Sequence, residues 1–154
     1  MRAAELIAAG GVLLRPPCAS FEEAVSGLVD TLIGSTQLPA AVRERAIRAV
    51  IGREAVASTA IVEIGVAVPH ARVEGVDGVV AALAASPSGL YYAMAGVPIS
   101  VMVIVLSAPE LVGEHLNTLA SVSLLLQSAA VRRGLEHADD AAVALRLLRG
   151  GIER

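Results

Sequence analysis

Residues 99–106 read ISVMVIVL, a strand-length run that is apolar except for Ser100 and rich in β-branched side chains. A run of this length and composition predicts a strand covered on both faces of a sheet, because a transmembrane helix needs ~20 unbroken apolar residues. The surrounding stretch, residues 78–109, carries no charge, but prolines and glycines divide it into short pieces. The sequence therefore favours a buried β-sheet over a membrane span.

Helical and strand-like segments alternate on both sides of this run. Ser20-Phe21-Glu22-Glu23 is a capping box that opens a helix ending at Gly34. A second apolar stripe follows Pro39 and is expected to end at Gly52, so that Arg53 begins a connection. Further strands are predicted at residues 12–14 and 76–84, and residues 59–68, with Gly65 among them, are expected to form two short strands or one bulged strand. Further helices are predicted at residues 3–9, after Pro109 and after residues 139–140. Helices before, between and after strands predict one layered α/β domain over residues 1–154.

Charge and composition remove several classes of function. The net charge is -3 and the pI about 5.6, which argues against a general nucleic-acid binder. All twelve basic residues are arginines, so a lysine Schiff base and a P-loop lysine are excluded. The single cysteine, Cys18, excludes an intramolecular disulfide and a cysteine-clustered zinc site. The sequence shows no signal peptide, so the cytoplasm is the expected location.

The three histidines are the first candidates for chemistry. His70 directly follows Pro69 at the end of a hydrophobic strand, in an expected loop, where functional side chains concentrate. A histidine in a loop is, however, more often an ordinary surface residue. His115 falls near the start of the helix after Pro109, where a neutral imidazole could donate a hydrogen bond to an anion or simply bond a nearby carbonyl. His137 is assigned no role, and no short ligand spacing supports a zinc site of histidines with Glu114.

Several short motifs then stand in a characteristic order. They are Arg53-Glu54, Ser58-Thr59-Ala60-Ile61, Gly65-Val66-Ala67-Val68-Pro69-His70 and His115-Leu116 followed by Leu119. This order resembles the fructose/mannitol-type enzyme IIA domain of the bacterial phosphoenolpyruvate-dependent sugar phosphotransferase system, a family that includes nitrogen-regulatory IIA proteins. The resemblance covers nearly the whole chain. It implies a three-layer α/β/α sandwich with a mixed central sheet.

The resemblance also implies a function. His70 would accept a phosphoryl group from the phosphocarrier protein HPr and pass it to a cysteine of a IIB component for sugar uptake. His115 would stabilise the phosphoryl group and Arg53 would supply positive charge, with no cofactor and no metal. Contact with the membrane would come only through these partner proteins. One departure from the family pattern is the segment Val62-Glu63-Ile64, which lengthens the connection before Gly65.

Three other functions stay open at this point. The first is a nitrogen-type regulatory protein that is phosphorylated on His70 but acts by binding other proteins. The second is a binding module that keeps the fold without the chemistry, although Arg53, His70 and His115 together speak against it. The third and most distant is a metal-binding enzyme.

Overall fold

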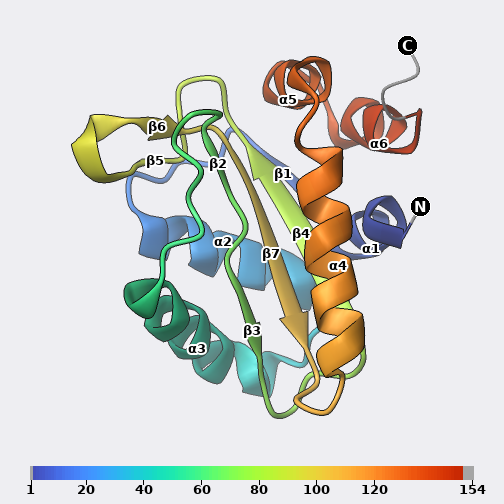
Figure 1. Cartoon of the computed structure of the whole chain (residues 1–154). Helices are drawn as coiled ribbons and strands as arrows, with labels where there is room; N and C mark the ends of the chain where they lie inside the picture. The colour runs from blue at the N-terminus through green and yellow to red at the C-terminus, as the bar shows by residue number, and fades with distance from the viewer. Residues whose placement is uncertain (1, 151–154) are drawn as a thin grey trace.

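The computed structural model describes residues 2–150, which form a central sheet between two layers of helices (Figure 1). One face of the sheet is covered by α2 (Phe21–Gly34) and α3 (Arg43–Val56). The other face is covered by α1 (Arg2–Gly10), α4 (Val112–Leu125), α5 (Ala129–Glu136) and α6 (Ala141–Gly150). This is the three-layer α/β/α sandwich that the resemblance implies. Of the expected domain 1–154, residues 1 and 151–154 lie outside the described part.

The sheet is mixed, as expected. Its strands run in the order β1 (Val12–Leu14), β4 (Val79–Ala85) and β7 (Val101–Ser107), followed by a last position shared by β2 (Val66–Ala67) and β3 (His70–Arg72). β1 is parallel to β4, β4 is antiparallel to β7, and both β2 and β3 are parallel to β7. A separate hairpin joins β5 (Tyr91–Tyr92) to β6 (Pro98–Ile99) around a short 3-10 helix, Met94–Gly96.

The run that predicted the sheet lies at its centre. In β7, Val101, Val103 and Val105 pack under α1 and α4–α6, whereas Met102, Ile104 and Leu106 pack under α2 and α3. All six side chains are fully buried. This alternation confirms a strand covered on both faces, because successive side chains of a strand point to opposite sides.

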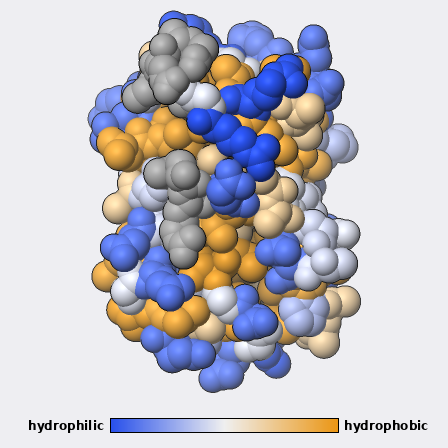
Figure 2. All heavy atoms as spheres, turned by 90° about the vertical axis from the view of Figure 1, so that its right-hand side faces the viewer, coloured by the Kyte–Doolittle hydropathy of each residue, from blue (hydrophilic) through white to orange (hydrophobic). Residues whose placement is uncertain are grey.

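No helix among residues 2–150 is both long enough and apolar enough to cross a membrane. Figure 2 shows the side of the molecule that carries α1, α4 and α6, and hydrophilic residues lie among the apolar ones there. The high hydrophobic content of the chain therefore fills two cores, one on each face of the sheet.

The start of α2 and the end of α3 can be compared with the helix boundaries predicted from the sequence. At the start of α2, Ser20 Oγ accepts a hydrogen bond from the backbone N–H of Glu23 at 3.1 Å, as the capping box predicts. The prediction that the next helix ends at Gly52 is wrong, because α3 continues to Val56. Gly52 lies exposed on α3, with open space where a Cβ would lie, and it costs the helix only about 1 kcal/mol, so it does not end it. Arg53 therefore lies in the last turn of α3 and not in a connection.

The segment before His70 also differs from the prediction. Of residues 59–68, only Val66–Ala67 form a strand, β2, and residues 62–65 form a turn across which Ile61 N–H donates to the Val66 carbonyl at 2.7 Å. Gly65 closes this turn with a φ of 68°, a conformation that favours glycine. The departing segment, residues 62–64, lies in this turn on the outside of the sheet.

The loop expected at residues 70–72 is instead a strand. β3 pairs with β7, with His70 opposite Val105. Pro69 interrupts the pairing, because β2 ends at Ala67 and β3 begins at His70, but it does not end it: the strand resumes in the same register against β7. Its carbonyl accepts from the Val105 N–H at 3.0 Å and so links β2 to β3 as one interrupted edge strand.

Candidate functional site

His70 is held at the open edge of the sheet by the backbone beside it. Its Nδ1 lies 2.9 Å from the carbonyl oxygen of Val68. A carbonyl can only accept, so Nδ1 carries the proton of the neutral ring and Nε2 carries the lone pair. The ring is half-buried and lines a cavity between α3 and α4. Its unprotonated nitrogen is therefore available as a nucleophile.

His115 brings a second imidazole to the same place from the first turns of α4. The two ring centroids lie 5.3 Å apart with an angle of 60° between the planes. Nδ1 of His115 lies 2.7 Å from Oγ of Ser107, at the end of β7, and the residue is only 5% exposed. Burial, and to a smaller extent the nearby charges of His70, Arg72 and Arg53, together lower the pKa of His115 to about 4. The His115 ring is therefore neutral at physiological pH.

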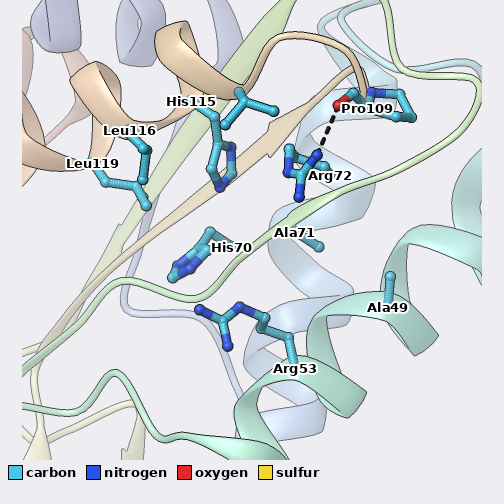
Figure 3. Close-up of a pocket in the computed structure, with 10 residues that line it drawn as sticks. Ala49, Arg53, His70, Ala71, Arg72, Pro109, His115, Leu116 and Leu119 are labelled. Atoms are coloured by element: carbon cyan, nitrogen blue, oxygen red, sulfur yellow. Dashed lines mark hydrogen bonds between the residues drawn. The ribbon is translucent and has the colours of Figure 1, made fainter.

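Two guanidinium groups complete the site (Figure 3). Arg53 extends from α3 on the side of His70 away from His115, and Arg72 lies beside His115. Nη1 of Arg72 donates to the Pro109 carbonyl at 2.8 Å. This hydrogen bond holds the Arg72 side chain against the segment that leads into α4. The structure thus brings together all three residues that the sequence singled out, Arg53, His70 and His115, although they lie far apart in the chain.

Arg72 is the residue that sequence reasoning missed. His70 and Arg72 both belong to β3, and residues two apart in a strand point to the same side. The expectation of a loop at residues 70–72 hid this relation. If residues 70–72 had been predicted as a strand, Arg72 would have been expected on the same side as His70.

The cavity between these residues has a volume of about 730 Å³. Its basic lining consists of Arg53, His70, Arg72 and His115, and the rest is apolar: Ala49, Ala71, Pro109, Val112, Leu116 and Leu119. No carboxylate belongs to this lining among the described residues. Within residues 2–150 no group of three or more histidine, cysteine or acidic side chains could hold a metal ion. A nucleophilic nitrogen, a neutral imidazole and two guanidinium groups suit an anionic, electrophilic group such as a phosphoryl group.

Solved structures share this fold at low sequence identity. The nitrogen regulatory protein IIA-Ntr from Neisseria meningitidis is 23% identical, with a TM-score of 0.78 over 96% of this chain and 99% of that chain. Enzyme IIA of the mannitol system from Escherichia coli, in its complex with phosphorylated enzyme IIB, is 21% identical, with a TM-score of 0.74 over 93% of this chain and 96% of that chain. A crystal structure of IIA mannitol from Escherichia coli gives 21% identity and a TM-score of 0.71 over 92% and 96% of the two chains.

The comparison with curated proteins gives no match. The family described as "Phosphoenolpyruvate-dependent sugar phosphotransferase system, EIIA 2" matches residues 5–150, which is almost the entire chain. That match extends through every element that contributes to the cavity, from α3 to α4. The chain therefore belongs to the EIIA 2 family of the phosphoenolpyruvate-dependent sugar phosphotransferase system and is a phosphotransfer component.

Proposed function

We propose that this protein carries a phosphoryl group on Nε2 of His70, accepting it from HPr and passing it to a cysteine of a IIB component for sugar uptake. The observation that carries the proposal is the hydrogen bond from His70 Nδ1 to the Val68 carbonyl, which leaves Nε2 unprotonated in a cavity whose charged groups are all basic. Membership of the family supports the phosphoryl relay. Such a relay would take place in the cytoplasm.

The transfer onto His70 is a displacement at phosphorus. The Nε2 lone pair attacks, an N–P bond forms, and the bond between phosphorus and the donor breaks with its electron pair leaving on the donor. In the onward step a thiolate of the acceptor attacks the same phosphorus, and the N–P electron pair returns to Nε2. The proton on Nδ1 stays in place throughout, so the ring needs no proton transfer of its own.

Arg53 and His115 stabilise the phosphoryl oxygens in this proposal. Phosphoryl transfer passes through a loose transition state, so the protein contributes mainly position and charge. Arg53 offers two N–H groups in a planar fork that matches two oxygens. When the Ser107 hydroxyl donates to Nδ1 of His115, Nε2 of that ring carries the proton and donates to a third oxygen. Arg72 adds a second positive charge at the same cavity.

Phosphorylation with residue mapping tests this proposal. Phosphorylated HPr is added as donor to the unmodified protein and to two variants, His70→Gln and the matched control His137→Gln, which removes an exposed histidine outside the cavity. We expect label on His70 in the unmodified protein and in the control, and none in His70→Gln. The variant His115→Gln should still accept the label but pass it on more slowly. Label retained by His70→Gln would refute the assignment.

The same experiment separates sugar uptake from the second candidate, a regulatory protein of the nitrogen type. Both would be phosphorylated on His70, so the acceptance step is common to them. Adding a IIB component after the label has been loaded distinguishes them, because a transport relay transfers the label to the IIB cysteine. Retention of the label on His70 in the presence of IIB components would favour the regulatory candidate.

A further inference from the structure

Behind His70, away from the cavity, a chain of hydrogen bonds connects the end of α3 to the strand edge. Oγ1 of Thr59 lies 3.1 Å from Oε1 and 3.2 Å from Oε2 of Glu54, and it also lies 3.1 Å from the backbone nitrogen of Val68. An ionised carboxylate only accepts and an amide N–H only donates. The Thr59 hydroxyl therefore donates to Glu54 and accepts from Val68, and its direction is fixed at both ends.

Glu54 is itself well held. Its carboxylate also accepts from the backbone N–H of Thr59 at 2.7 Å and from Oγ of Ser58 at 3.1 Å. Glu54 is half-buried in the last turn of α3, directly after Arg53. One helix end thus supplies a guanidinium to the cavity and a carboxylate to the back of the strand.

Val68 connects this chain of hydrogen bonds to the imidazole of His70. It lies in the interruption between β2 and β3, outside the residue pairs that these strands make with β7. Its N–H donates to Thr59, and its carbonyl accepts from Nδ1 of His70 at 2.9 Å. Val68 is buried, so an N–H without an acceptor would be costly there. The Thr59 hydroxyl therefore holds the backbone of the very residue whose carbonyl holds the imidazole.

We propose that Thr59, oriented by Glu54, is a positioning residue that keeps His70 in the tautomer with the proton on Nδ1. The proposal rests on the proposed function of His70 as phosphoryl acceptor. If the backbone at Val68 loses its anchor, its carbonyl no longer faces Nδ1, and the proton of the neutral ring can move to Nε2. A ring with its proton on Nε2 has no lone pair facing the cavity and cannot attack phosphorus.

Three variants test this role. Thr59→Val keeps the shape of the side chain but removes the hydroxyl, whereas Thr59→Ser keeps the hydroxyl. Ser58→Ala is the matched control, because Oγ of Ser58 also bonds Glu54 but makes no bond to Val68. Two quantities are measured: the tautomer of His70 from the nitrogen chemical shifts of its imidazole in the unphosphorylated protein, and the rate of phosphoryl acceptance from HPr.

We expect Thr59→Val to shift His70 toward the tautomer with the proton on Nε2 and to slow acceptance roughly tenfold to a hundredfold, as loss of an orienting group or a small misplacement does. Thr59→Ser and Ser58→Ala should stay close to the unmodified protein in both quantities. Glu54→Gln offers a second approach in case Thr59→Val does not fold. Its amide nitrogen cannot accept, so it should shift the tautomer in the same direction.

An unchanged tautomer and an unchanged rate in Thr59→Val would overturn the proposal, as would an equal effect of Ser58→Ala. The two measurements also separate this proposal from the proposed function. If the unmodified protein accepts no phosphoryl group, the proposed function fails, while the imidazole spectra still decide whether Thr59 sets the tautomer.

Discussion

Acidification should destabilise this protein through His115, by an amount that its burial determines. The pKa of His115 falls from its ordinary value of 6.5 to about 4 in the folded protein, first because of burial. Between these values the unfolded chain binds a proton that the folded protein does not. Stability therefore falls as the pH drops from 6.5 toward 4, and the full contribution is present above 6.5. At about 1.4 kcal/mol per pKa unit, the loss is roughly 3 kcal/mol.

Urea unfolding of the unmodified protein and of His115→Gln, between about pH 7.5 and about pH 4, isolates this effect. Carboxyl groups titrate in the same range in both proteins, so the difference between their free energies of unfolding removes that common part. We expect this difference to shrink by roughly 3 kcal/mol on acidification. His137→Gln, which removes an exposed histidine, should follow the unmodified protein.

A difference that stays constant across this range would refute the reasoning, since it would mean that His115 gains its proton equally in the folded and unfolded chains. Imidazole proton shifts of His115 provide a direct check. A titration of that ring near pH 6.5 would show that it is not held neutral, and its proposed action as a neutral hydrogen-bond donor would fall as well.

Two more changes have definite expected outcomes. Gly10→Ala should lower the free energy of unfolding by about 2–4 kcal/mol, because a Cβ there would lie 1.7 Å from the Ala81 carbonyl oxygen and separate α1 from β4. Gly52→Ala should instead raise it by about 0.5–1 kcal/mol, because that position on α3 is open, and urea unfolding that ranked the two variants the other way would contradict the packing described here. Arg72→Gln should raise the pKa of His115, because the Arg72 guanidinium helps to lower it. Proton shifts of the ring would show this, and an unchanged pKa would mean that the guanidinium does not face His115.

The central strands could be predicted because a strand that is buried on both faces has a largely apolar sequence. Residues 99–106 and 76–84 are largely apolar, and they correspond to β7 and β4 within a few residues at each end. The hairpin of β5 and β6 was not predicted, because each strand has two residues and no repeating pattern can develop over that length. β2 lies within the strand region expected at residues 59–68, whereas β3 was missed because a loop was expected after Pro69.

Edges and helix ends were the points at which local rules misled. A glycine commonly ends a helix, yet Gly52 lies within α3, since its small local cost is offset by the packing of Val50 and Ile47 on the same helix. A proline commonly ends a strand, yet Pro69 only interrupts this one, because the pairing with β7 resumes at His70 in the same register. Both errors concern tertiary context, which no window of local sequence contains.

The residues of the candidate site could be predicted where their side-chain chemistry and order in the chain were informative. They could not be predicted where only their position in the folded structure was informative. Arg53, His70 and His115 were selected by type and by their order in the chain, and the cavity contains all three. Arg72 and Ser107 became visible only when the strand register was known, because each acts through a partner distant in the sequence: Pro109 for Arg72 and His115 for Ser107.

The two imidazoles of the site have the same covalent structure, so their different roles must come from their surroundings. His70 is half-exposed on an edge strand and bonded to a backbone carbonyl, which suits the nucleophile of the proposed relay. His115 is buried against the Ser107 hydroxyl and neutral, which suits its proposed role as a hydrogen-bond donor. Positive charge then has to come from groups that stay protonated at every physiological pH, and arginine is the side chain with that property. The charges of Arg53 and Arg72 therefore persist when the pH changes, so the cations of the proposed phosphoryl site do not depend on the proton concentration.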